Sequence, residues 1–157
     1  MMIDFNSRGY ITPPEAIDVD FDTFKQTFVV NNHRQVIFDE YQTFLASLKN
    51  LQIEPFFQWI NGSFTTQKPH PNDIDVVTFI DFEAKEQHQD FLNALKSESL
   101  PRKIDAYFVA TYPENHPQFL NAKADKLDFY HKFVRDWKQE RRTGQKLLKG
   151  FVQLNFK

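Results

Sequence analysis

Two aspartates separated by one apolar residue lie near the middle of the chain. Asp73 and Asp75 open an apolar run that ends at Ile80, and this pattern predicts a β-strand over residues 73–80. Successive side chains of a strand alternate between its faces, so both carboxylates are expected on the same face. Carboxylates at a shared site repel each other unless a cation neutralises them, and aligned carboxylate oxygens are the usual ligands of Mg²⁺. The pattern therefore predicts a site for Mg²⁺ or Mn²⁺.

A Gly-Ser pair lies a short distance upstream of these aspartates. Gly62 and Ser63 follow a predicted strand, Phe56–Ile60, and precede a short helix predicted over residues 63–67. Glycine lets the backbone approach a ligand closely, and the amide and hydroxyl of Ser63 could donate to phosphate oxygens. Taken alone, the pair is more typical of an ordinary turn with a helix N-cap. Beside the two aspartates, it favours a cradle for the phosphates of a metal-bound nucleotide.

A third candidate carboxylate lies in the next predicted strand. Residues Lys103–Ala110 form an apolar run in which Asp105 is the only acidic residue. A buried carboxylate without a partner is costly, so its presence there needs a reason. If this strand lies beside the strand of residues 73–80, Asp105 joins the two aspartates at one site. The alternative is an ion pair with Arg102 or Lys103 at the strand entrance.

Further polar residues could complete a nucleotide site. The threonines after the Gly-Ser pair could line a pocket, or they could only cap and pack the short helix. Basic residues near the C-terminus could supply positive charge to a triphosphate, or they could complement the dipole of the preceding helix; they are Arg141, Arg142, Lys146 and Lys149. The residues predicted to contact a nucleotide are Gly62, Ser63, Thr65, Lys68, Lys146 and Lys149.

Two amphipathic helices are predicted to pack against these strands. Apolar residues recur at helical spacing over residues 34–50 and again over residues 83–97. With the three strands, these helices make up the expected core of the site, residues 35–110.

The two ends of the chain have different patterns. Residues 1–34 predict an extended N-terminal arm with a short helix over residues 22–28. A long helix is expected over residues 119–142, with Gly144 at its C-terminal stop. Residues 151–156 alternate like a final strand.

Length and composition are those of a single domain, residues 1–157. The chain is long enough to bury a core, and it has no cysteine, which excludes disulfide scaffolds, thiolate zinc sites and cysteine nucleophiles. The net charge of -2 provides no overall electrostatic basis for general nucleic-acid binding. No stretch approaches the ~20 apolar residues of a membrane span, and the N-terminus lacks the pattern of a signal peptide. We therefore expect a soluble cytoplasmic protein without a membrane partner.

The central motif resembles that of a known superfamily. An apolar strand, Gly62-Ser63, nine intervening residues and Asp73-x-Asp75 are similar to the signature of the nucleotidyltransferases related to DNA polymerase beta. The segments Phe5–Tyr10, Pro13–Pro14 and Gly62–Pro69 further resemble an uncharacterised prokaryotic family of small nucleotidyltransferase-like proteins. The similarity covers most of the chain. It implies an α+β, polymerase beta-like fold, with a small mixed sheet flanked by helices and a long C-terminal helix.

The resemblance also implies a reaction. Asp73, Asp75 and Asp105 would hold two Mg²⁺ ions against the triphosphate of an NTP such as ATP, and a nucleoside monophosphate would pass to an acceptor hydroxyl. Asp105 would also accept the proton of that hydroxyl. Minimal members of the superfamily act on a protein or a small molecule, and some modify a toxin partner. The expected partners are therefore an NTP and such an acceptor, with a cognate toxin among the candidates.

Two other functions remain open from the sequence. The chain is expected to lack the helical domain with which larger superfamily enzymes close over substrate, which favours an inactive fold serving as an antitoxin or complex subunit. The presence of all three candidate carboxylates favours an enzyme. A metal-dependent phosphodiesterase could use the same acidic cluster, and pyrophosphate release would distinguish transfer from hydrolysis.

Overall fold

A five-stranded mixed sheet forms the centre of the computed structural model, which describes residues 2–139 and 146–157, with the backbone alone for residues 136–139 and 146. The strand order is β3-β9-β4-β5-β6. The strands are β3 (Ala16–Asp18), β4 (Phe56–Asn61), β5 (Ile74–Asp81), β6 (Ile104–Thr111) and β9 (Phe151–Phe156). β4 is antiparallel to β5 and β9, whereas β5 pairs with β6, and β3 with β9, in parallel. The α+β class and four predicted strands are thereby confirmed.

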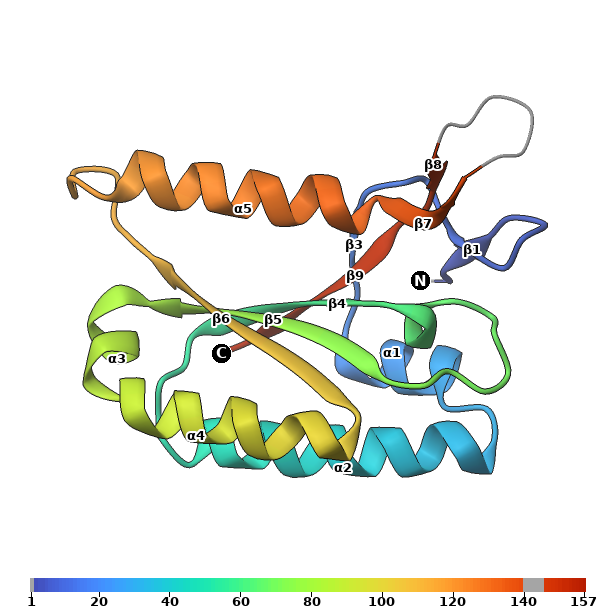
Figure 1. Cartoon of the computed structure of the whole chain (residues 1–157), viewed down its shortest axis with the longest axis horizontal. Coiled ribbons are helices and arrows are strands. Elements are labelled where there is room, and N and C mark those ends of the chain that lie inside the picture. The colour runs from blue at the N-terminus through green and yellow to red at the C-terminus, as the bar shows by residue number, and fades with distance from the viewer. Residues whose placement is uncertain (1, 140–145) are drawn as a thin grey trace.

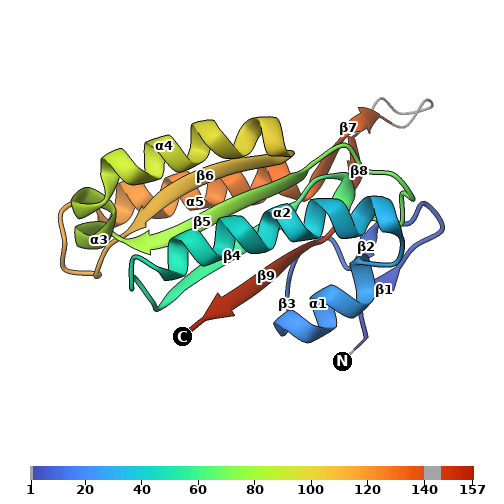
Figure 2. The same cartoon turned by 90° about the horizontal axis from the view of Figure 1, so that it is seen from below.

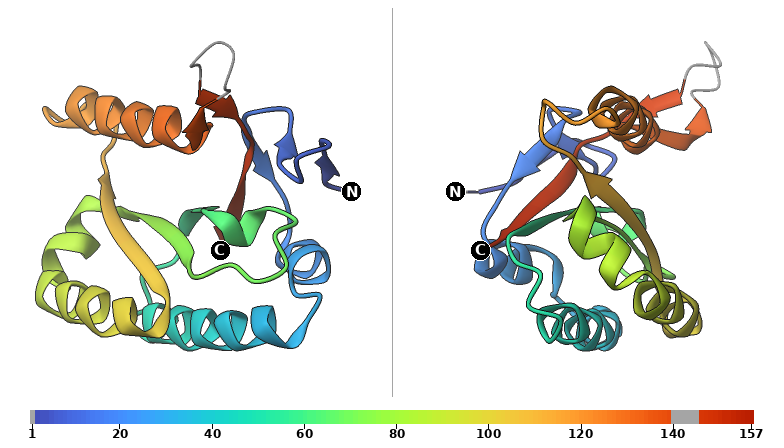
Figure 3. Two further views of the ribbon diagram at one scale, coloured as in Figure 1. Left: turned by 45° about the vertical axis from the view of Figure 1, so that its right-hand side comes forward. Right: turned by 90° about the vertical axis from the view of Figure 1, so that its left-hand side faces the viewer.

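Helices cover both faces of this sheet. Below it in Figure 1 lie α1 (Phe21–Phe28), α2 (Asn32–Lys49) and α4 (Gln89–Ser99), and above it lies α5 (Phe119–Phe133). Figure 2, seen from below, and Figure 3 show α2 and α4 side by side across the lower face. No described helix combines the length and apolar character needed to cross a membrane.

Strand residues alternate between two apolar clusters. Val76 belongs to the larger cluster on the α2 side, which also holds most of the phenylalanines of α1 and α2. Its neighbour Val77 belongs to the smaller cluster under α5, together with Trp59, Phe133 and Phe151. Because the period of the strand is two, this alternation fixes which polar residues point toward α5.

The prediction of an N-terminal arm over residues 1–34 was wrong. This segment contains a small hairpin of β1 (Asp4–Phe5) and β2 (Ile11–Thr12), followed by β3 and α1. β3 pairs with β9 at the far end of the chain, a non-local contact that local periodicity does not report. The short helix expected at residues 22–28 is confirmed as α1, which is capped by Asp20.

The helix expected over residues 83–97 is divided in two. α3 (Phe82–Gln87) ends at His88, and α4 continues from Gln89. The amide of His88 is bonded to carbonyls of the preceding turn, and its backbone leaves helical geometry with φ -109° and ψ 19°. After α4, a short 3-10 turn (Leu100–Arg102) leads into β6.

The long helix expected over residues 119–142 was also predicted wrongly. α5 ends at Phe133, and the chain continues as β7 (Arg135–Gln139), which pairs antiparallel with β8 (Lys146–Leu148). Gly144, the expected helix stop, lies outside the described residues.

The end of α5 is fixed by packing and by a returning strand. Phe133 and Val134 are buried in the cluster under α5. The amide of Lys149 donates to the carbonyl of Val134 at 2.9 Å, which ties the chain after β8 to this point. Helical spacing of apolar residues continues past Phe133 in the sequence, but pairing with a downstream segment determines the conformation there.

Candidate functional site

Three polar residues lie in register at one end of the sheet. Asp75 on β5 is opposite Asn61 on β4 and opposite Asp105 on β6. Residues opposite each other in a sheet point to the same face, and Asp73 lies immediately before β5. The face is the α5 side, because Trp59 is two residues from Asn61 on the same strand and packs under α5. The predicted adjacency of the two aspartate-bearing strands is therefore confirmed.

The three aspartates line one cavity of about 880 Å³. Four of the residues predicted to contact a nucleotide line the same cavity, and they are Gly62, Ser63, Lys68 and Lys149. Residues that are distant in sequence, on β5, on β6 and after β8, thus meet at one place.

The electrostatics of the cavity reflect its crowding with carboxylates. Burial, then the negative charges of Asp73 and Asp105, raise the pKa of Asp75 to about 6, against the opposing positive charge of Lys149. The pKa of Asp73 is also raised, first by burial and then by the charge of Asp105. Neighbouring negative charge therefore disfavours the charged forms of Asp73 and Asp75, an effect that a bound cation relieves.

The donor set fits a hard divalent cation. Three carboxylates line the same cavity, and the buried Oδ1 atom of Asn61 has no hydrogen-bond partner among the described residues. Carboxylate and amide oxygens are the ligands that Mg²⁺ accepts. Within the described part of the chain, however, no three acidic, histidine or cysteine side chains are already arranged to hold a metal ion. The metal site therefore stays a prediction.

Gly62 allows the turn to pack directly against Asp75. Its φ of +85° lies in the region that favours glycine, and a Cβ atom there would be 2.9 Å from Oδ2 of Asp75. Close backbone approach was predicted at this glycine, and the group it approaches in the structure is the Asp75 carboxylate. Any side chain at this position would displace that carboxylate or the turn.

Arg34 on α2 donates hydrogen bonds to the backbone that follows Gly62. The sequence motif did not indicate this residue. Arg34 lies in the first turn of α2 and is only 1% exposed. Its guanidinium donates to carbonyls of the loop and of α1, and the acceptors are those of Phe28, Ser63, Phe64, Thr66 and Lys68. The distances to the carbonyls of Phe64 and Thr66 are both 2.7 Å.

Arg34 determines the shape of this loop. Because several loop carbonyls accept hydrogen bonds from its guanidinium, these carbonyls point toward α2 and away from solvent. The ring of Phe64, 5.0 Å from the guanidinium carbon, covers the same group, and burial lowers the pKa of Arg34. A sequence signal did exist, because Arg34 precedes Ile37 and Tyr41 by three and seven residues and so lies on the apolar stripe of its helix.

The N-terminal hairpin supplies another wall that was not predicted. Residues 7–10 line the cavity, and the carbonyl of Gly9 accepts a hydrogen bond of 2.9 Å from the amide of Gln67. Tyr10 forms an isolated β-bridge with Thr66. No spacing within the sequence indicates this contact, since the two segments are joined only in the folded chain.

The two remaining predicted contacts, Thr65 and Lys146, do not join the described lining of the cavity. Thr65 is 1% exposed and does not line the cavity. Its hydroxyl donates to the carbonyl of Gly62 at 3.3 Å, so it packs the short 3-10 helix (Ser63–Thr65), which was the alternative. The side chain of Lys146 lies outside the described residues, as do Arg141 and Arg142.

Asp105 takes the cavity position rather than the alternative at the strand entrance. Within the described ranges it forms no ion pair with Arg102 or Lys103. Its Oδ2 atom instead accepts a long hydrogen bond of 3.5 Å from the hydroxyl of Tyr107.

Comparison with known proteins identifies a family but no characterised relative. No curated protein and no solved structure matches the chain. The match to a protein family extends over residues 3–155, which includes every described residue of the cavity. The chain therefore belongs to the family of unknown function DUF6932.

Proposed function

We propose that the chain is a Mg²⁺-dependent nucleotidyltransferase, which transfers a nucleoside monophosphate from an NTP to a hydroxyl group of a protein or small-molecule acceptor. The observation that carries this proposal is the register of β5 and β6. It aligns Asp75 with Asp105, beside Asp73, in a cavity that also contains the Gly62-Ser63 turn. The cysteine-free composition fits a reducing compartment, and we propose the cytoplasm.

The lysines of the cavity support a polyanionic ligand. Lys68 and Lys149 both line it, and Lys149 is only 7% exposed, so its charge acts in a partly desolvated environment. A metal-bound triphosphate requires both kinds of charge. The carboxylates bind the metal ion, and the positive charges of the lysines attract the phosphate oxygens.

The proposed reaction is an in-line displacement at the α-phosphorus. When bound, Mg²⁺ would acidify the acceptor hydroxyl and stabilise the leaving pyrophosphate. The acceptor oxygen forms a bond to the α-phosphorus as the bond to the bridging oxygen breaks. Asp105 accepts the hydroxyl proton, and Lys68 and Lys149 neutralise charge on the phosphates. The products are the acceptor nucleoside monophosphate ester and pyrophosphate.

A second candidate is an inactive nucleotidyltransferase-like fold that serves as an antitoxin or complex subunit. The observation that favours it is that the described carboxylates are not already arranged as a metal-binding group. An inactive module of this kind would bind its partner without consuming NTP.

The decisive experiment measures transfer of label from each α-labelled NTP with Mg²⁺, using the purified chain alone and in lysate. The Asp73→Asn/Asp75→Asn variant serves as the inactive form. The Asp22→Asn/Asp90→Asn variant is the matched control, because it changes net charge equally at two exposed positions.

We expect label on an acceptor, and release of pyrophosphate, with the wild type and the control but not with the inactive form. Absence of transfer together with absence of Mg²⁺-dependent nucleotide binding in calorimetry would refute the enzyme and favour the interaction module.

A further inference from the structure

The outer edge of β6 is open on the side of the sheet opposite the N-terminal hairpin. β6 is the last strand in the sheet order, and β5 is its neighbour on one side only among the described strands. Residues 106–111 contain neither proline nor a charged residue, the features that commonly protect strand edges. Tyr107 is 37% exposed, and the residues that follow it on β6 are partly exposed. A long apolar edge of this kind can accept a further strand.

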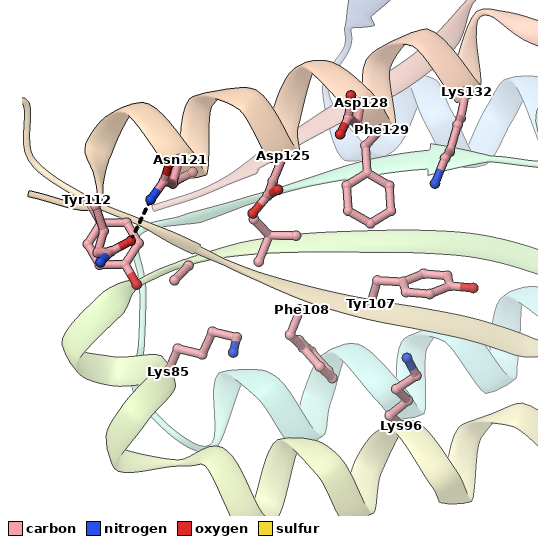
Figure 4. Close-up of a pocket in the computed structure, with 14 residues that line it drawn as sticks. Lys85, Lys96, Tyr107, Phe108, Tyr112, Asn121, Asp125, Asp128, Phe129 and Lys132 are labelled. Carbon is pink, nitrogen blue, oxygen red and sulfur yellow. Dashed lines mark hydrogen bonds between the residues drawn. The ribbon is translucent and has the colours of Figure 1, made fainter.

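This edge forms the floor of a second cavity, of about 520 Å³, drawn in Figure 4. The lining includes residues 107–110, and α5 stands on one side of them with α3 and α4 on the other. Figure 4 shows Asp125 pointing from α5 toward the strand, while Lys85 and Lys96 point toward it from the opposite side. The cavity is therefore a groove along β6 between two walls of different character.

The wall formed by α3 and α4 is basic. The Nζ atom of Lys85 donates to Gln89 at 3.1 Å, and Gln89 in turn donates to Asn93 at 2.9 Å. The Nζ atom of Lys96 lies 4.3 Å from the centroid of the Tyr107 ring. These partners are uncharged, and within the described part of the chain neither lysine forms an ion pair with a carboxylate. The wall therefore keeps two positive charges that a ligand could complement.

We propose that this groove binds an extended polypeptide segment that pairs with β6 and carries acidic side chains at alternate positions. The backbone groups of β6 that point away from β5 supply hydrogen bonds, and the period of two turns every second side chain of the segment toward the same wall. In the bound segment, the side chains that face Lys85 and Lys96 are acidic. Those that face α5 are apolar or basic, because they lie opposite Phe129 and Asp125. This binding is independent of any nucleotide chemistry.

The charges favour such a segment over a second copy of the chain. Antiparallel pairing of two β6 edges about a two-fold axis would place the basic wall of one copy beside the basic wall of the other. Like charges so placed repel each other. In addition, residues 106–111 of β6 offer no acidic side chain to the lysines of a neighbouring copy.

Fluorescence anisotropy with two labelled synthetic peptides tests the proposal. Glutamate alternates with valine in the first peptide, and arginine alternates with valine in the second. We expect the first to bind with a Kd on the order of 10–100 μM, and the second to bind at least about tenfold more weakly. The Lys85→Glu/Lys96→Glu variant should reverse this preference.

A matched variant and a second measurement keep the test specific. Lys25→Glu/Lys123→Glu makes the same change in net charge at exposed positions outside the groove, and it should leave both affinities unchanged. Amide hydrogen exchange should show that the acidic peptide protects residues 107–110. Equal affinities in all variants, or binding without protection of β6, would overturn the proposal. So would concentration-dependent dimerisation that protects β6 without peptide, because a second copy would then occupy the edge.

Discussion

Replacing Asp75 by asparagine is expected to stabilise the folded chain at neutral pH. Burial and the charges of Asp73 and Asp105 raise the pKa of Asp75 from its usual 3.8 to about 6, so the folded state favours the protonated carboxyl. The stability that protonation provides is complete below pH 3.8 and is lost as the pH rises through about 6. Asparagine has a similar shape and does not ionise, so the variant avoids this loss.

The pKa of Asp75 sets the magnitude of this effect. A rise from 3.8 to about 6 corresponds to about 3 kcal/mol, since each pH unit represents 1.36 kcal/mol of differential interaction. The free energy of unfolding of the variant should therefore exceed that of the wild type by up to about 3 kcal/mol near pH 8. Near pH 4 the difference should almost vanish.

Urea unfolding, followed by circular dichroism at a series of pH values, measures this difference. Asp39→Asn is the control, because Asp39 is exposed in the middle of α2, and its effect on the free energy of unfolding should stay within about 0.5 kcal/mol. A difference for Asp75→Asn that is equal near pH 4 and pH 8, or a variant less stable than the wild type near pH 8, would refute the role of burial and repulsion. Added Mg²⁺ should then raise the stability of the wild type alone.

Three further substitutions test two contacts of the site and one of the core. Arg34→Ala should lower the free energy of unfolding by at least about 3 kcal/mol, because several loop carbonyls lose their donor, whereas Gln35→Ala at the next, exposed position should have little effect in the same urea titration. Gly62→Ala should lower the free energy of unfolding by about 1–3 kcal/mol and abolish Mg²⁺-dependent nucleotide binding in calorimetry, since the added Cβ meets Asp75. Unchanged stability would contradict the close contact. Tyr41→Phe should lower the free energy of unfolding by about 1–2 kcal/mol in thermal or urea unfolding, because its buried hydroxyl donates to a glutamine side chain of β4. An unchanged free energy would mean that this hydrogen bond contributes nothing to stability.

The sequence by itself determined the local elements and the composition of the candidate site. Apolar runs predicted β4, β5 and β6, and alternation predicted β9, because a strand buried on both faces has a continuous apolar sequence whereas a half-exposed strand alternates. The spacing of Asp73, Asp75 and Asp105 predicted that their carboxylates share a site if two strands are adjacent, and the register of β5 with β6 has this property. Of the predicted nucleotide contacts, four line the same cavity as these carboxylates.

Only the tertiary structure decided which distant segments complete the site. Arg34 donates hydrogen bonds to the loop after Gly62, and the N-terminal hairpin forms a wall of the cavity. The pairing of β3 with β9 and the end of α5 at Phe133 likewise depend on partners far along the chain. Local periodicity reports which face of an element is buried, but it contains no information on which segment buries it. That choice is made by packing and by hydrogen bonds between segments that meet only in the folded chain.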